Sequence, residues 1–339
     1  MKRFAPSDRH RVRISDVAAR AGVSKTTVSH VLSGNRPVAA ATRERVLDAI
    51  EALGYRPDGI ARSLRTRRSH MVALIVPNIG NPYYTVLARG LDRGIDGTAY
   101  RVVICNTEGR HEQELEYVVD MCDRRVDGIV LDSFTLSDAS IREIAGSGVP
   151  VVWIGAETLE HPGVDTVKAD DEHGAYEATT HLMQRGRTRI GMIEGTPGSG
   201  TPRNDGYRRA LRDAGLEVNA ALIRHGEWTR AGGARAGHAM LAADERPDAI
   251  FCANDLMAIG VLDVLRDAGC RVPDDVALAG FDDIEAAAMV TPPLTTVTNP
   301  AFETGRAAGE LLATRMVGGY DGEPRHLVLS CELVVRAST

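Results

Sequence analysis

Residues 13–32 read RISDVAARAGVSKTTVSHVL, two short amphipathic segments on either side of Gly22. Ser15 and Ser24 stand where each segment begins, and a serine oxygen can accept a hydrogen bond from a free backbone N–H at a helix start. Gly22 stands between the segments, where a tight turn needs a positive φ angle. This stretch therefore predicts two short helices joined by a tight turn.

The apolar residues of this stretch are small or β-branched and suit a very small core: Val17, Ala18, Ala21, Val23, Val28, Val31 and Leu32. A helix-turn-helix needs a small residue, a turn glycine and two buried apolar residues at fixed positions, and Ala18, Gly22, Val28 and Val31 stand at those positions. The second helix then presents its N-terminal side chains to base edges in a DNA major groove. The candidate DNA contacts are Ser24, Lys25, Thr26, Thr27, Ser29 and His30. A purely solvent-facing role for His30 is the alternative.

Residues 40–53 predict a third helix, with Val46, Ile50 and Leu53 on one face and no good capping side chain before it. Gly54 and Pro57 then interrupt the pattern. Residues 59–65 form at most one short further helix, too short to be stable alone in water. We expect this segment to fold when it meets DNA.

Charge is distributed unevenly along the 339 residues. Residues 1–70 hold 15 Lys and Arg against 6 Asp and Glu, whereas the remainder holds 25 against 40. A basic head on an acidic body indicates that the head meets phosphate and the body does not. A solvated basic tail is the alternative interpretation.

From His70 onward, apolar runs alternate with helix-like stretches. The runs are 71–76, 102–105, 128–132, 150–154, 190–193, 249–253 and 276–281. Near-continuous apolar strands that alternate with helices predict doubly wound parallel sheets covered on both faces, here enough for two subdomains. Ligands of such sheets bind at the carboxyl ends of the strands.

Aromatic, charged and amide side chains follow several of these runs: Tyr83, Tyr84, Arg203, Trp228, Asn254 and Asp282. An aromatic face with charged or amide groups beside it suits a polyhydroxylated ring, whose hydroxyls both donate and accept. Other roles stay open: Arg203 could cap a helix and pair with Asp205, Asn254 could be only a helix cap, and Trp228 could fill the core.

Other features exclude several classes of protein. We expect no signal peptide and no membrane-spanning run, and five scattered cysteines indicate reduced thiols in the cytoplasm. The glycine-rich run 195–201 lacks the lysine of a phosphate-binding loop. No dinucleotide motif, nucleophile elbow or metal-ligand spacing occurs. We therefore expect no enzymatic activity, no catalytic residue, no cofactor and no metal.

Several segments closely resemble the LacI–GalR family of transcriptional regulators. In the head these are residues 13–24 with 27–29, 49–57 and 61–64; in the body they are 72–78, 125–130, 253–255 and 294–297. The resemblance implies a small all-α helix-turn-helix headpiece followed by an α/β bilobed core, similar to periplasmic sugar-binding proteins. It makes Lys25 and Thr26 the base-reading pair. It also implies DNA contacts at Ala61, Arg62 and Leu64, with Leu64 as a wedge in the minor groove. His30 departs from the arginine usual in the family.

By the same resemblance, Arg203, Asn254, Asp282 and Trp228 are effector contacts, with Tyr83 and Tyr84 as an aromatic pair. Asn299 stands where many members have glutamine, and Gly155 where some sugar-responsive members have aspartate. Pro197 stands where purine-sensing members have arginine, which disfavours a purine effector. We therefore expect a repressor controlled by a sugar or sugar derivative. The alternatives are a nucleoside effector, a protein co-regulator or a pure sugar-binding module.

The expected organisation is a headpiece (1–54), a hinge (55–69) and a bilobed effector-binding core (70–339). One lobe takes residues of about 70–167 and 294–325, and the other about 168–293 and 326–339. We expect a cytoplasmic homodimer on a palindromic operator, because a two-fold dimer matches a two-fold DNA site. Helices near 83–97, 111–124 and 254–268 are candidate dimer contacts.

Overall fold

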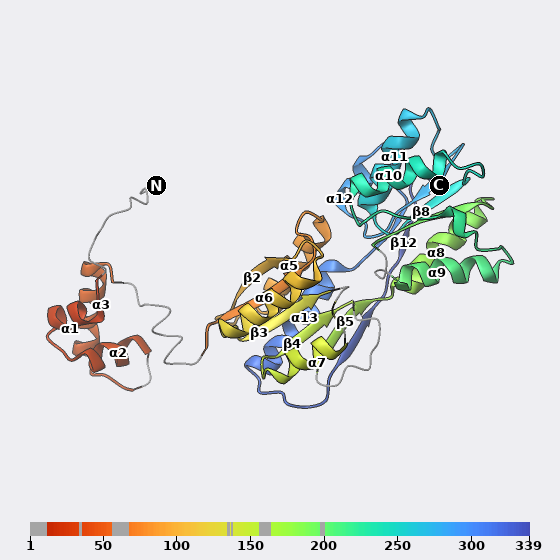
Figure 1. Ribbon diagram of the computed structural model, residues 1–339. Coiled ribbons are helices and arrows are strands. Elements are labelled where there is room, and N and C mark those ends of the chain that lie inside the picture. The colour runs from red at the N-terminus through yellow and green to blue at the C-terminus, as the bar shows by residue number, and fades with distance from the viewer. Residues whose placement is uncertain are drawn as a thin grey trace. The chain divides into compact units, whose positions relative to one another are not determined.

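The protein is described by a computed structural model that covers residues 12–33, 36–55, 68–133, 136, 138–155, 164–196 and 201–339 (Figure 1). The chain divides into two units, Met1–Ser69 and His70–Thr339. Among the described residues, no helix is both long enough and apolar enough to cross a membrane.

The first unit is a three-helix headpiece of α1 (Ile14–Ala21), α2 (Lys25–Ser33) and α3 (Ala40–Leu53). Its core is small: Val17, Ala18, Ala21, Val28, Val31, Val46 and Ala49 are buried. Gly22 ends α1 at a φ of +66°, a left-handed conformation that glycine adopts at little cost. The predicted helix-turn-helix and the predicted third helix are both confirmed.

Two of the three expected helix starts are as predicted. Ser24 Oγ accepts from the backbone N–H of Thr27 at 3.1 Å, and Ala39 gives α3 no side-chain cap. The expected cap at Ser15 is wrong. The first helix starts two residues earlier, after Arg13, whose backbone N–H donates to the Asp16 carboxylate at 2.8 Å. A charged carboxylate is a stronger acceptor than a hydroxyl, so Asp16 closes this end and Ser15 lies inside the helix.

The second unit begins with an N-lobe built on a six-stranded parallel sheet of order β11-β5-β4-β3-β1-β2. The strands are β1 (Met71–Val76), β2 (Arg101–Asn106), β3 (Gly128–Asp132), β4 (Val151–Ile154), β5 (Asp165–Ala169) and β11 (His326–Leu329). Successive residues of β1 point to opposite faces. Val72, Leu74 and Val76 therefore enter one core, and Ala73 and Ile75 the other.

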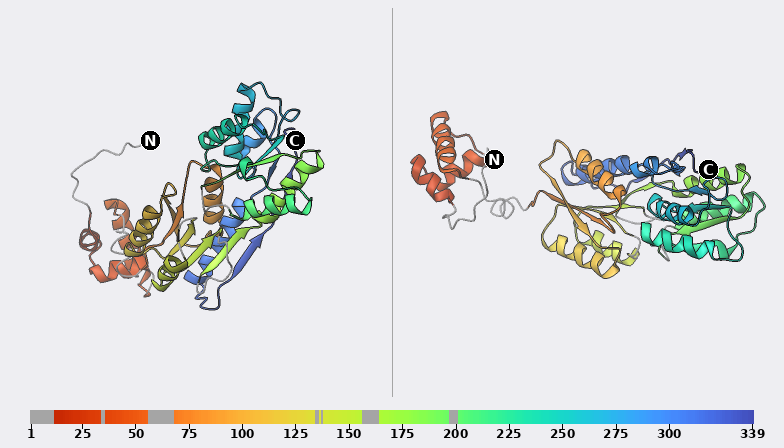
Figure 2. Two further views of the ribbon diagram at one scale, coloured as in Figure 1. Left: turned by 45° about the vertical axis from the view of Figure 1, so that its right-hand side comes forward. Right: turned by 90° about the horizontal axis from the view of Figure 1, so that it is seen from above.

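Helices cover both faces of this sheet, as Figure 2 shows. One face carries α5 (Pro82–Gly94) and α13 (Ala301–Met316), and the other carries α6 (His111–Asp123) and α7 (Asp138–Gly146). The backbones of α5 and α13 approach closely, since a Cβ added at Gly90 would lie 2.0 Å from the carbonyl oxygen of Phe302.

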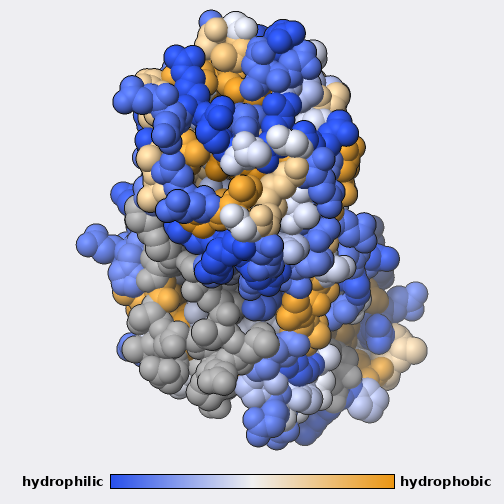
Figure 3. Space-filling view, turned by 90° about the vertical axis from the view of Figure 1, so that its right-hand side faces the viewer, coloured by the Kyte–Doolittle hydropathy of each residue, from blue (hydrophilic) through white to orange (hydrophobic). Residues whose placement is uncertain are grey.

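The C-lobe is built on a four-stranded parallel sheet of order β7-β6-β8-β9. Its strands are β6 (Ile190–Glu194), β7 (Ile223–His225), β8 (Ala249–Cys252) and β9 (Ala277–Ala279). Its helices are α8 (Asp171–Gln184), α9 (Thr201–Asp213), α10 (Arg230–Leu241), α11 (Asp255–Asp267) and α12 (Glu285–Met289), with a 3-10 turn at Ala220–Leu222. On the face seen in Figure 3, hydrophilic side chains predominate over small apolar areas.

Three segments join the lobes. The first runs from β5 into α8. The second follows β10 (Thr296–Val297), and the third precedes β12 (Leu333–Val334), which pairs with β10 in antiparallel fashion. Because β11 pairs in parallel with β5, the N-lobe continues to Leu329 and the third crossing follows it, later than the expected position near 325. Two doubly wound parallel sheets are confirmed.

Candidate functional site

A cavity of about 320 Å³ lies between the two lobes, at the carboxyl ends of their strands. Six of the seven candidate effector residues line it: Tyr83, Tyr84, Arg203, Trp228, Asp282 and Asn299. The lining also includes acidic residues that sequence reasoning missed, namely Glu108, Glu114, Asp132, Asp171 and Glu227.

Arg203, in the first turn of α9, is the central basic group of the C-lobe wall and is only 7% exposed. Its Nε donates to Asp171 at 3.1 Å, and its Nη1 lies 3.2 Å from Asp282 and also donates to the carbonyl of Ala253. The predicted alternative partner Asp205 is not among these contacts. Burial lowers the pKa of Arg203, but Asp171 and Asp282 raise it further, so the guanidinium stays charged.

Asp282 follows β9 with a φ of +104°, a conformation that favours glycine. Its backbone N–H donates to the carbonyl of Val297 at 2.9 Å, which holds it against the crossing strand. Asn299 Nδ2 donates to Asp282 Oδ1 at 3.1 Å, while Asn299 Oδ1 is buried without a hydrogen-bond partner among the described residues. Burial raises the pKa of Asp282, and Arg203 opposes the rise. Asn299 therefore offers a spare acceptor at the cavity.

Trp228 lies in the loop between β7 and α10, where both Glu227 and Trp228 have positive φ angles. Its ring fills the space beside Gly195, because a Cβ there would lie 2.0 Å from Trp228 Cε2. The carbonyl of Trp228 accepts from Asn254 Nδ2 at 3.3 Å.

Asn254 is the one candidate effector residue that does not line the cavity. It is fully buried and caps α11, with Oδ1 accepting from the N–H of Met257 at 2.9 Å. The amide therefore does two structural jobs, since it caps a helix and holds the Trp228 loop. Asn254 is a positioning residue behind the aromatic wall.

The N-lobe wall carries the aromatic pair. Asn81 caps α5 by accepting from the N–H of Tyr83 at 3.0 Å, and the rings of Tyr83 and Tyr84 meet edge to face at 5.1 Å. Tyr84 also hydrogen-bonds to Asp132 at the end of β3. Burial, followed by the charges of Glu114 and Asp171, raises the pKa of Asp132 to about 8. Asp132 therefore exchanges its proton near neutral pH.

The sequence carried a usable signal for two of the missed residues. Asp132 ends the apolar run 128–132, and Asp171 begins α8 two residues after the end of β5, so both stand near strand ends. Glu114 gave no such signal. It lies on α6, is 1% exposed, and accepts from Ser133 Oγ at 2.6 Å.

The candidate DNA-contact helix is α2. Ser24, Lys25 and Thr26 are exposed, whereas Thr27, Ser29 and His30 are half-buried. The Thr27 hydroxyl lies 2.9 Å from Ser24 Oγ, so Thr27 supports the helix start. The hinge residues Ala61, Arg62 and Leu64 lie outside the described residues.

Comparisons with known proteins bear on both units. A model of bacterial regulatory proteins of the lacI family matches residues 13–58, and a model of the periplasmic binding protein-like domain matches residues 179–339. Catabolite control protein A of Priestia megaterium is 36% identical over 308 residues, which cover 90% of this chain and 92% of that protein. The chain belongs to the lacI family.

Other members of the lacI family match along nearly the whole chain. The HTH-type transcriptional repressor PurR of Photobacterium profundum is 34% identical over 96% of this chain and 98% of its own length. A solved complex of the transcriptional regulator CelR with cellobiose is 35% identical with a TM-score of 0.73, covering 97% of this chain and 100% of that one. The lac repressor dimer bound to operator and the anti-inducer ONPF has a TM-score of 0.86 at 25% identity, over 97% of this chain and 99% of that one.

These relatives are transcriptional regulators. As a member of the lacI family, the chain is a DNA-binding transcriptional regulator with a helix-turn-helix headpiece and a periplasmic-binding-protein-like core.

Proposed function

We propose that this regulator is a homodimeric repressor whose operator affinity is set by a sugar or sugar derivative bound between the lobes. The carrying observation is the composition of the cavity: among the described lining residues, aromatic rings from both lobes stand beside carboxyl groups, one guanidinium and three asparagine amides. Such walls suit a polyhydroxylated ring, because the rings pack on its C–H faces and the polar groups pair with its hydroxyls. The relative CelR is a regulator solved with cellobiose.

A ligand in this position acts on both lobes together. Tyr83, Tyr84 and Asp132 belong to the N-lobe, whereas Arg203, Trp228 and Asp282 belong to the C-lobe. A ligand that contacts both walls favours one arrangement of the lobes. It can change the operator affinity only by as much as it binds that arrangement more tightly than the other. No catalytic residue, cofactor or metal enters this mechanism.

The proposed operator contacts are those of α2 and the hinge. Lys25 and Thr26 are exposed at the start of α2, where a recognition helix meets base edges. The many basic residues of the head neutralise phosphates, which makes binding fall steeply with salt. Gel shift of a palindromic site from the gene's own promoter region, at several salt concentrations, tests this. Leu64→Ala should weaken operator binding and leave the core folded and ligand-competent.

The deciding experiment is isothermal titration of two variants against the identified sugar. Loss of a charged partner costs roughly 1.5–3 kcal/mol, so Arg203→Ala and Asp282→Ala should each weaken binding about ten- to a hundredfold. Both variants should still bind operator. Asp263→Ala is the matched control, because Asp263 also pairs with arginine, but its arginine partners are exposed and it does not line the cavity.

Wild-type affinity in both cavity variants would place the ligand elsewhere. A response to nucleosides in place of sugars would select the nucleoside alternative. A core that binds neither would favour control by a protein partner.

A further inference from the structure

The inner part of the cavity carries an excess of carboxyl groups. Glu114 is 1% exposed and Asp132 4%, while the side chains of Asp282 and Asp171 are 5% and 25% exposed. Among the described lining residues, Arg203 is the only basic one.

The guanidinium of Arg203 is already occupied. Its Nε and Nη2 each lie 3.1 Å from Asp171 Oδ1, and its Nη1 meets Asp282 and the carbonyl of Ala253. Phe281 covers one face, with the ring centroid 3.8 Å from Arg203 Cζ. A phosphate or carboxylate usually binds arginine through two parallel N–H groups. Here it would have to displace one of the two aspartates.

Apart from Arg203, the charged side chains in the described lining are all carboxyl groups. An ionised carboxylate only accepts hydrogen bonds, and so does the spare Oδ1 of Asn299. Hydroxyl groups of a ligand can donate to all of these, whereas a phosphate oxygen can donate to none of them. The Asp132 carboxyl, whose pKa is raised to about 8 first by burial and then by its acidic neighbours, can hold a proton and donate to a ring or glycosidic oxygen.

We infer that the cavity takes a carbohydrate without phosphate or carboxylate groups, and that it rejects the phosphorylated and uronic-acid forms of the same sugar. This inference rests on the proposed function. The rejection is large. One unneutralised carboxylate about 6 Å from a ligand anion, at an effective dielectric constant of about 20, weakens binding about a hundredfold.

The test uses the full chain with Trp153→Phe, so that Trp228 is the sole tryptophan. Trp153 is 6% exposed in the N-lobe core, where phenylalanine keeps the apolar contacts, and Trp228 lines the cavity. D-glucose, D-galactose, D-ribose, maltose and cellobiose are titrated, each beside its phosphorylated form, with the uronic acids of glucose and galactose added. Trp228 fluorescence reports binding, and gel shift on the operator reports the response.

The expected result is that at least one uncharged sugar shifts the fluorescence and changes operator binding, while its anionic counterpart binds about a hundredfold more weakly or worse. An anionic member that binds as tightly as its uncharged counterpart, or more tightly, overturns the inference and leaves control by sugars intact. A panel in which no carbohydrate alters the fluorescence overturns the proposed function, and the inference with it.

A pair of variants separates charge from shape. Asp171→Asn frees donors of Arg203 and removes one negative charge. It should therefore reduce the ratio of the affinities for the uncharged sugar and its anionic counterpart at least about tenfold. Asp170, not Asp171, caps α8, so the helix start is preserved. Asp96→Asn is the control, since Asp96 does not line the cavity and pairs with the exposed Arg93 at 2.8 Å. It should leave the discrimination within about threefold, because exposed charges are screened. Equal discrimination in wild type and Asp171→Asn would show that shape, not charge, sets the selectivity.

Discussion

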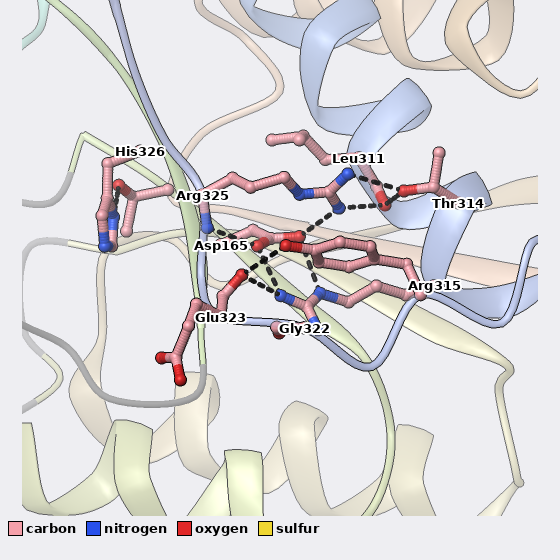
Figure 4. Close-up of polar contacts among 10 residues, drawn as sticks. Asp165, Leu311, Thr314, Arg315, Gly322, Glu323, Arg325 and His326 are labelled. Atoms are coloured by element: carbon pink, nitrogen blue, oxygen red, sulfur yellow. Dashed lines mark hydrogen bonds and ion pairs between the residues drawn. The ribbon is translucent and has the colours of Figure 1, made fainter.

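Asp165 is the first residue of β5 and is fully buried at the amino-terminal end of the parallel strands of the N-lobe sheet. Figure 4 shows it between Arg315 and Arg325. Arg315 donates from Nε at 2.8 Å and Nη2 at 2.7 Å, and Arg325 donates from Nη2 at 2.7 Å and its backbone N–H at 2.8 Å. The ring of Tyr320 lies within 4.9 Å of both guanidinium carbons. One carboxylate thus ties the end of α13 and the start of β11 to β5.

Asp165→Asn should destabilise the core strongly. Removing one partner of a buried ion pair costs about 3–5 kcal/mol, because the remaining charges stay buried without compensation. For a unit of this size that lowers the melting temperature by about 5–15 °C. Urea unfolding of the full chain, followed by tryptophan fluorescence, measures the loss, since Trp153 and Trp228 both belong to the core unit.

The chain contains a matched control. Asp263 also bridges two arginines, with Arg230 Nη2 at 2.5 Å and Arg266 Nη2 at 3.1 Å, but those arginines are 62% and 68% exposed. Exposed pairs contribute about 0–1 kcal/mol, so Asp263→Asn should change the stability little. If the two variants lost the same stability within about 1 kcal/mol, the reasoning from burial would be refuted.

The pH dependence gives an independent check. Burial raises the pKa of Asp165, but the hydrogen bonds from Arg315 and Arg325 lower it further, so the folded-state pKa lies below the usual value. A lowered pKa means that the stabilisation is present above about pH 4 and is lost as the pH falls through the folded-state value. The difference between wild type and Asp165→Asn should therefore shrink below about pH 4.

Three further predictions concern other sites. Burial, followed by the charges of Glu114 and Asp171, raises the pKa of Asp132 to about 8. The folded core therefore loses stability as the pH rises from about 4 to 8 and Asp132 ionises. Asp132→Asn should raise the urea midpoint more at about pH 8 than at about pH 5. Gly195→Ala should displace the Trp228 ring, shift its emission and weaken ligand binding at least about tenfold, with a stability cost of about 1–3 kcal/mol. Ser24→Ala removes the cap of α2 and should cost the headpiece about 1 kcal/mol, measured by its thermal unfolding, while ligand affinity stays unchanged.

The elements that the sequence predicted best are those with a strong local pattern. Near-continuous apolar runs marked β1, β3, β4, β6 and β8 within a residue or so of their observed bounds. The strands β5 and β11 were not predicted. In β5 the residues read Asp-Thr-Val-Lys-Ala, and β11 is a four-residue strand, His-Leu-Val-Leu, that is mostly exposed at the sheet edge. The polar start of β5 can be buried only because Arg315 and Arg325, about 150 residues away, neutralise Asp165.

The site shows the same division between local and distant causes. Residues that end apolar runs, such as Asp282, were identifiable because strand ends of parallel sheets face the ligand. Glu114 was not identified, although it lies in the first turn of α6 on the same face as the buried Val118 and Met121. An isolated carboxylate on that face can be buried only with a partner, and Ser133, which donates to Glu114, lies 19 residues away in the sequence.

Asn254 illustrates how one residue can satisfy two interpretations. A helix cap and an effector contact were alternatives in the sequence, and the structure supports the cap directly through Met257. Yet the amide nitrogen Nδ2 of Asn254 donates to the carbonyl of Trp228, whose left-handed backbone needs such support. A substitution at Asn254 would therefore weaken ligand binding without removing any contact to the ligand, because it releases the loop that presents the aromatic wall. A loss of affinity at this position shows that a residue matters to the cavity, and the geometry is needed to show that it acts through Trp228.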